Sequence, residues 1–178
     1  MHPDLLALLL RRHSPQQAGG GLNKMFVSRR GRRKGWITMS KIAVVFWSGT
    51  GNTEAMAKAV EEGAKGKGAE VVEYNASAFS AGEAANFDAI AFGCPAMGAE
   101  VLEEGEFQPM WDEVKGSLKG KKIALFGSYG WGTGEWMDSW KADAEAEGAV
   151  LAADPVIANN APDDDALNQC KGLGEALA

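Results

Sequence analysis

The chain alternates between short apolar segments and longer amphipathic ones from about residue 42 to its end. Residues 42–47 form a continuous apolar run, which is typical of a strand buried on both faces. After this run in the sequence, Met56, Val60 and Ala64 recur at the spacing of one helix face. The alternation continues, and it predicts further strands at 69–74, 88–93, 122–128 and 149–157 and helices around 53–65, 80–86, 107–118, 135–147 and 163–177.

Strands that alternate with helices in this way favour a parallel sheet, because each helix carries the chain back to start the next strand. We therefore predict an α/β fold of three layers: a doubly wound, five-stranded parallel sheet with helices on both faces, in one domain without repeats. Ligands of such sheets bind at the carboxyl ends of the strands. The loops after the first, third and fourth strands are the candidates for chemistry.

Charge divides the chain into two parts, which the formal net charge of −6 conceals. Residues 1–38 carry eight Lys and Arg against one acid, Asp4, for a net +7. Residues 39–178 carry ten Lys, no Arg, no His and 23 Asp and Glu, for a net −13. So acidic a domain repels nucleic acid and anionic membranes. The lack of His and Arg in residues 39–178 also excludes histidine catalysis, His-ligated zinc and Arg-clamped phosphoryl transfer.

The composition changes abruptly at Met39. We predict a basic, disordered N-terminal extension over residues 1–38 and a domain proper over residues 39–178. An organellar transit peptide is the alternative for the extension, since it is rich in Arg and poor in acids. Cys94 and Cys170 are too few for a disulfide framework or a four-thiolate metal site, which favours a reducing, cytoplasmic location and no bound metal.

The loop after the first strand concentrates neutral hydrogen-bond donors at the start of a helix, a pattern that suits an anion. No lysine lies between Lys41 and Lys58, so the loop is not a P-loop. A dinucleotide fingerprint would need a third small residue near Glu54, although Glu73 lies at the spacing of a ribose ligand. A helix-capping turn is the structural alternative. We favour a permanently anchored cofactor phosphate on Ser48, Gly49, Thr50, Gly51, Asn52 and Thr53.

The loop after the third strand contains Pro95, Ala96, Met97, Gly98, Ala99 and Glu100. Gly98 can take a positive φ at little cost, so a peptide there could reorient between two states. Met97 offers a soft apolar surface, although for this residue taken alone core packing is the favoured interpretation. Cys94 has no basic neighbour in the sequence and is predicted to be a buried, inert thiol.

The loop after the fourth strand contains Ser128, Tyr129, Gly130, Trp131 and Gly132. A tryptophan between glycines cannot pack from a regular element, so we expect Trp131 to be exposed at the rim, where it would contact a flat ligand. The other tryptophans of the domain are assigned to packing, namely Trp47, Trp111, Trp136 and Trp140.

Together, residues 48–53, 93–98 and 127–132 resemble, in order and spacing, the three loops of short-chain flavodoxins, and the resemblance covers residues 39–178. It implies the strand order 2-1-3-4-5 and non-covalent binding of FMN. By this resemblance, residues 48–53 would hold the phosphate, and Met97 and Trp131 would flank the isoalloxazine ring. Glu100 would hydrogen-bond flavin N3, and the family's peptide flip would fall on Gly98. The chain departs from the family at Ala99, where members often carry Asp or Ser.

The function expected from these observations is that of a monomeric, low-potential, one-electron carrier that serves basic redox partner proteins. Acidic groups oppose the negative charge of reduced flavin, and they attract cationic proteins. Glu100, Glu103, Glu104 and Glu106 lie beside the loop that follows the third strand, as a docking face or as ordinary solvated surface. The alternatives are a quinone or NAD(P)H reductase, which the lack of Arg disfavours, and a flavin-free signalling domain, which would want paired acids after the first strand.

Overall fold

The computed structural model describes residues 38–178, which belong to one compact unit. The predictions for the N-terminal extension fall outside the described residues. The strands are β1 (Lys41–Phe46), β2 (Glu70–Asn75), β3 (Ala89–Gly93), β4 (Lys122–Tyr129), β5 (Val150–Leu151) and β6 (Val156–Asn159). The helices are α1 (Asn52–Gly66), α2 (Ala81–Ala84), α3 (Phe107–Val114), α4 (Glu135–Ala146) and α5 (Asp164–Leu177).

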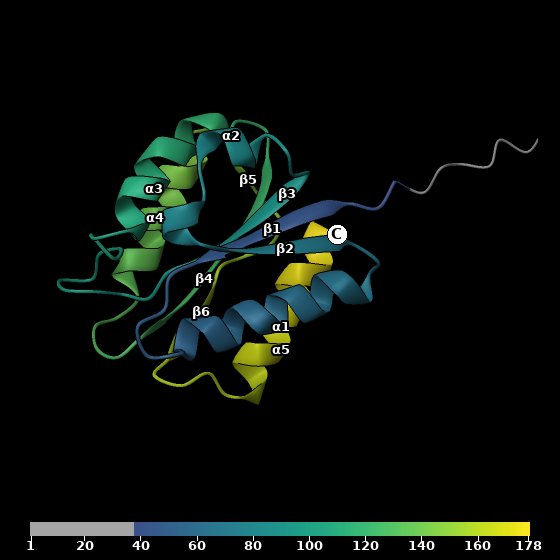
Figure 1. Ribbon diagram of the computed structural model, residues 1–178. Helices are drawn as coiled ribbons and strands as arrows, with labels where there is room; N and C mark the ends of the chain where they lie inside the picture. The colour runs from purple at the N-terminus through teal and green to yellow at the C-terminus, as the bar shows by residue number, and fades with distance from the viewer. Residues whose placement is uncertain (1–37) are drawn as a thin grey trace, which may run out of the picture. The chain divides into compact units, whose positions relative to one another are not determined.

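All the strands pair in parallel in one sheet of order β2-β1-β3-β4-β5, and β6 also pairs with β4 (Figure 1). The central strands β1, β3 and β4 are buried along most of their length, as their apolar runs predicted. The predicted strand order and the doubly wound α/β class are therefore confirmed.

Two separate hydrophobic cores form because successive residues of a strand point to opposite faces of the sheet. Ala43 and Val45 of β1 face the layer of α2, α3 and α4, which contributes Trp111 and Trp140 to its core. Ile42, Val44 and Phe46 face the layer of α1 and α5. Figure 1 shows these two helix layers on opposite sides of the sheet. This arrangement leaves the loops at the carboxyl ends of the strands free of helix cover.

The fifth predicted strand, 149–157, is wrong in its extent. It is divided into β5 and β6, and β6 continues to Asn159. Leu151 pairs with Ile123 and Val156 with Phe126, so the four residues 152–155 lie opposite only 124–125 of β4. The interruption contains Asp154 and Pro155; a proline has no N–H to give to a ladder, and it restricts the residue before it.

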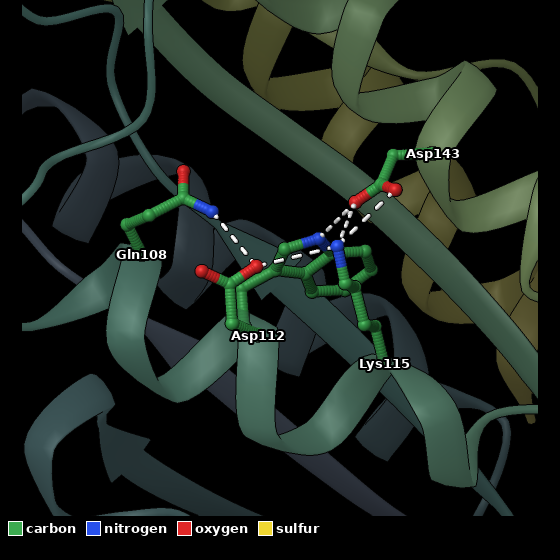
Figure 2. Close-up of polar contacts among 5 residues, drawn as sticks. Gln108, Asp112, Lys115 and Asp143 are labelled. Carbon is green, nitrogen blue, oxygen red and sulfur yellow. Dashed lines mark hydrogen bonds and ion pairs between the residues drawn. The ribbon is translucent and has the colours of Figure 1, made fainter.

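The two helices of the tryptophan-rich layer, α3 and α4, are joined by a polar network at their surface (Figure 2). The Asp143 carboxylate accepts from Nε1 of Trp111 at 2.7 Å and pairs with Nζ of Lys115 at 3.1 Å. Lys115 lies in a 3-10 turn that follows α3, where the predicted helix was expected to continue to residue 118. Asp112 pairs with Lys115 at 3.2 Å and accepts from Gln108, so the network also runs along α3 into this turn.

On the other face, α1 and α5 approach each other closely at two glycines. A Cβ at Gly63 would lie 2.0 Å from the carbonyl oxygen of Lys171, and one at Gly174 would lie 1.9 Å from that of Val60. Only glycine fits at these two positions, because any Cβ would collide with the backbone of the facing helix. Within residues 38–178, no helix has the length and apolar character needed to cross a membrane.

Candidate cofactor-binding site

A cavity of about 320 Å³ lies at the carboxyl ends of the strands, where the three loops singled out in the sequence come together. The first loop contributes Gly49, Thr50 and Asn52, and the third-strand loop contributes Pro95, Ala96 and Met97. The structure thus joins nine of the predicted residues in one concave surface, and it adds two others. The full lining is Trp47, Gly49, Thr50, Asn52, Pro95, Ala96, Met97, Ser128, Tyr129, Gly130 and Asn160.

The first loop presents the N-terminus of α1 to this cavity. The loop turns at Gly51, whose φ of 91° is in the left-handed region that favours glycine. The Ser48 hydroxyl accepts from the N–H groups of Gly51 at 3.1 Å and Glu54 at 3.3 Å, so it closes the loop on itself. The first N–H groups of a helix lack partners within it and carry partial positive charge, which favours an anion beside them.

A buried pair of hydroxyls joins the start of α1 to the end of β4. Thr53 is 1% exposed and Ser128 is 6% exposed, and their side-chain oxygens lie 3.4 Å apart. Thr53 and Ser128 come from segments 75 residues apart in the sequence. Their contact fixes two walls of the cavity relative to each other.

The third-strand loop is a tight hairpin at the rim. Met97 and Val101 exchange both backbone hydrogen bonds, at 2.8 and 3.0 Å, and so close the segment between them. Gly98 has a φ of 50°, which confirms the positive φ expected there. The Met97 side chain is 39% exposed, so the interpretation of core packing is wrong for it. Ala99 is exposed at the tip of this hairpin.

Trp131 is the most exposed of the large apolar side chains in the described part of the chain, at 65%. It does not line the cavity but lies beyond it, between Gly130 and Gly132. Gly132 and Gly134 have φ values of 91° and 98°, so the loop makes two left-handed turns before α4 begins. The prediction of an exposed tryptophan on this loop is confirmed.

Glu100 does not point freely into solvent. Its Oε1 accepts the backbone N–H groups of Thr133 at 2.9 Å, Gly134 at 2.7 Å and Glu135 at 3.2 Å. These groups form the start of α4, so the carboxylate lies at the positive end of that helix. The structure shows this use of the side chain in addition to the flavin contact that the resemblance implied.

Glu103 serves α3 in the same way. Its two carboxylate oxygens accept from Gly105 at 2.7 Å, Glu106 at 2.8 Å and Phe107 at 2.9 Å. Desolvation would raise the pKa of Glu103, but these three N–H donors outweigh it and lower the pKa from its usual value. Of the four acids predicted as a docking face, Glu104 and Glu106 are exposed, whereas Glu100 and Glu103 accept hydrogen bonds at helix ends.

The sequence reasoning missed two residues of the cavity, Trp47 and Asn160. Trp47 was assigned to packing alone; it does pack against the core, but it also lines the cavity at the end of β1. Asn160 follows β6 and has a φ of 59°. The predicted fifth strand ended too early, at 157, so the loop after it was not considered. The position of Asn160 at the carboxyl end of a strand could have marked it as a candidate for the site.

The remaining aromatic assignments are confirmed. Trp111, Trp136 and Trp140 are at most 2% exposed. Cys94 is also fully buried, and burial raises the pKa of its thiol to about 12, as expected for an inert cysteine. The Cys94 carbonyl accepts from Trp136 Nε1 at 3.3 Å, and a Cβ at Gly127 would lie 2.0 Å from the same oxygen. These contacts pack the ends of β3 and β4 against α4.

The flavodoxin family model matches residues 44–172, and this chain belongs to the flavodoxin family. It is 46% identical over 137 residues to the flavodoxin of Megasphaera elsdenii, covering 77% of this chain and 98% of that protein. The flavodoxin of Clostridium beijerinckii is 44% identical over 135 residues, with 76% and 97% covered. The solution structure of two-electron reduced Megasphaera elsdenii flavodoxin matches with a TM-score of 0.71 at 47% identity, covering 76% of this chain and 97% of that one.

Flavodoxins are electron-transfer proteins that bind FMN, so the family fixes both the cofactor and the general activity. The site agrees with that cofactor. The N–H groups at the start of α1 suit a phosphate. A cavity lined by Met97, with the exposed Trp131 next to the lining residue Gly130, suits a flat, partly apolar ring.

Proposed function

We propose that this protein is a low-potential, one-electron carrier that shuttles between basic redox partner proteins. In this proposal FMN binds without a covalent bond at the carboxyl ends of β1, β3 and β4. The phosphate is held by Ser48, Gly49, Thr50, Gly51, Asn52 and Thr53. The ring lies among Pro95, Ala96, Met97, Gly98, Ala99 and Glu100 on one side and Ser128, Tyr129, Gly130, Trp131 and Gly132 on the other.

The observation that carries the proposal is the convergence of the three loops on one cavity whose lining, within the described residues, contains no Lys or Arg. A transferred phosphoryl group would need cations to stabilise its charge. Here the donors are backbone N–H groups, hydroxyls and an amide, which supports a phosphate that serves only as an anchor.

Bound FMN supplies the electron chemistry, and the chain's own residues tune it. Met97 and Trp131 exclude water from a ring placed between them, which lowers the local dielectric constant. Residues 39–178 carry a net charge of −13, which opposes the addition of negative charge to the ring. Both effects lower the reduction potential.

The same acidity supports the proposal of basic partners. Glu104 and Glu106 are exposed beside the rim and could attract a cationic surface. Encounters of this kind are transient and sensitive to salt. A monomer in the cytoplasm fits this role, and the two free, buried cysteines support a reducing compartment.

The test is the visible absorbance of the purified full-length protein during stepwise reduction under anaerobic conditions. We expect a bound flavin spectrum and two resolved one-electron steps, the second at low potential. A protein that cannot be loaded with FMN would refute the cofactor site. Rapid steady oxidation of NAD(P)H without any partner would instead favour the reductase alternative.

A further inference from the structure

Within residues 38–178, the side chain of Glu100 makes the only hydrogen bonds that link the Met97 hairpin to the backbone at the start of α4. One carboxylate oxygen receives three N–H groups at 2.7 to 3.2 Å. Hydrogen bonds to an ionised acceptor are about twice as strong as neutral ones. The contact joins residues 33 to 35 positions apart in the sequence, so it is tertiary rather than a local cap.

The α4 side of this contact is shaped to admit the carboxylate. A Cβ at Gly132 would lie 2.4 Å from Cδ of Glu100, closer than real Cβ atoms come to any neighbour. Gly132 also has a φ of 91°, which disfavours other residues. Glu100 itself has a φ of 53°, uncommon for a residue with a side chain. Both partners therefore hold unusual backbone conformations where they meet.

Each end of the contact is directly connected to one wall of the proposed ring site. On one side, the paired hydrogen bonds between Met97 and Val101 close the hairpin that carries Glu100, so Glu100 and Met97 belong to one closed turn. On the other side, Gly132 follows Trp131, and Thr133 and Gly134 are the next residues.

We propose that Glu100 is a positioning residue that couples the Met97 hairpin to the Trp131 loop and so sets the spacing of the slot between them, whether or not flavin is bound. The inference rests on the proposed function for the identity of the ligand. It differs from a contact with flavin N3 because the partner of the carboxylate is the protein itself.

Glu103 supplies a matched control. It lies three residues further along, carries the same charge and accepts three backbone N–H groups at 2.7 to 2.9 Å. Its partners, however, belong to the start of α3 and not to the Trp131 loop. E103Q and E100Q therefore remove the same charge from the same segment, and only E100Q alters the coupling.

The first measurement is amide hydrogen exchange in the full chain, with and without FMN. In E100A we expect exchange at Thr133, Gly134 and Glu135 to rise at least tenfold in both states. E100Q keeps an acceptor oxygen, so it should show an intermediate rise. The indole Nε1–H resonance of Trp131 should shift in both Glu100 variants without flavin. In E103Q these signals should stay unchanged, while exchange at Gly105, Glu106 and Phe107 rises.

The second measurement is the FMN dissociation constant and the shape of the bound-flavin absorbance bands. Loss of the coupling should raise the dissociation constant of E100A about tenfold and change the band shape, with a smaller change for E100Q. E103Q should bind FMN as the wild type does, even if its thermal stability falls. G132A, which pushes the carboxylate away from α4, should reproduce the E100A result.

The outcomes separate the inference from the function on which it rests. A wild-type protein that does not bind FMN refutes the proposed function, but the exchange data without flavin still test the coupling. If the wild type binds FMN and exchange at Thr133, Gly134 and Glu135 is unchanged in flavin-free E100A, the coupling is wrong. A change seen only with flavin bound would assign Glu100 to the ligand alone.

Discussion

Single carboxylates in this domain have very different roles, although the sequence shows only a high density of Asp and Glu. Glu100 and Glu103 accept N–H groups at helix ends. Glu61 on α1 and Glu73 on β2 differ from them, because each of these carboxylates lies close to the other. Oε1 of Glu61 is buried without a hydrogen-bond donor in the described part of the chain, while its Oε2 pairs with Lys65 at 2.7 Å. Two carboxylates close together favour a shared proton.

This acid pair predicts a dependence of stability on pH. Sharing of a proton with the Glu61 carboxylate, burial and the charge of Glu61 raise the pKa of Glu73 above its ordinary value of 4.5. A raised pKa in the folded state means that stability falls as pH rises from 4.5 through the folded value. Glutamine at this position stays neutral and can donate to Glu61. E73Q should therefore melt higher than the wild type at pH 7, and the difference should vanish at pH values below 4.5.

Melting temperatures measured by calorimetry from acid to neutral pH would check this. E70Q is the control, because Glu70 lies on the same strand but pairs with Lys41 at 3.9 Å and should gain nothing from the change. An E73Q variant less stable than the wild type at neutral pH would contradict the shared proton.

Both cysteines should be unreactive in the folded protein. Burial raises the pKa of Cys94 and of Cys170 to about 12, so little thiolate exists at pH 8, and neither sulfur is accessible. They also belong to different cores on opposite faces of the sheet and cannot pair. Iodoacetamide labelling followed by mass spectrometry should show both thiols modified only in denaturant; fast labelling of the native protein would show that one of them is exposed.

At this scale, the sequence predicted the turn at Gly98 and the exposure of Trp131, because glycines and an isolated tryptophan have strong local preferences. It could not predict what Glu100 and Glu103 do. Their partners depend on where α3 and α4 start in space, and a glutamate in a loop has no local signal that separates a cap from a solvated charge. Trp47 was missed for a similar reason, since a side chain at the end of a buried strand can pack and line a cavity at once.

Among the elements, the crossing of α1 and α5 makes the sharpest prediction. G174A places a methyl group 1.9 Å from the carbonyl oxygen of Val60, so one of the two backbones must shift. Overpacking of this kind costs about 1–3 kcal/mol of folding stability.

Gly172 is the control, because it lies in the same helix and a Cβ there would meet nothing within 4 Å. G172A should instead stabilise the protein by about 0.5–1 kcal/mol, because alanine favours helix more than glycine does. Urea unfolding would compare them, and equal effects would show that the helices do not pack this closely.

Element types and order followed from periodicity, since buried parallel strands and amphipathic helices carry strong patterns. The fifth strand was the exception. Its composition, with two alanines before Asp154 and Pro155, reads as one apolar segment, and only the pairing with β4 shows that the ladder is interrupted. The helix expected to run to residue 118 was also too long, because the Lys115 turn is held by Asp143, a contact between elements.

For the molecule as a whole, charge predicts how the proposed electron transfer responds to salt. With a Lys-rich c-type cytochrome as the acceptor, the bimolecular rate measured by stopped flow should fall as ionic strength rises. The double variant E104Q/E106Q, which removes two of the exposed charges, should show a weaker dependence of the rate on ionic strength. E175Q is the control for position, because Glu175 lies near the end of α5, beside the amino end of β4, where Lys122 bonds the Ala176 carbonyl. A rate independent of salt would refute electrostatic steering.

The boundary at residue 39 remains a prediction that truncation can test. If residues 39–178 are the functional domain, a chain that starts at Met39 should match the full chain in melting temperature and in FMN affinity. The described residues support this, because they contain both hydrophobic cores and the whole cavity. A shortened chain that fails to fold or loses FMN would place part of the working protein in the first 38 residues.

The interrupted fifth strand has a further consequence for intermolecular strand pairing. A sheet edge with a long row of unpaired N–H and C=O groups is a template on which a second chain can add a strand. Here the edge beyond β4 is broken after Leu151, and Pro155 removes one donor from it. At the opposite edge, β2 carries the charges of Glu70 and Glu73. Neither edge offers a smooth surface for intermolecular pairing, so the same irregularity that shortened the predicted strand protects the open sheet against aggregation.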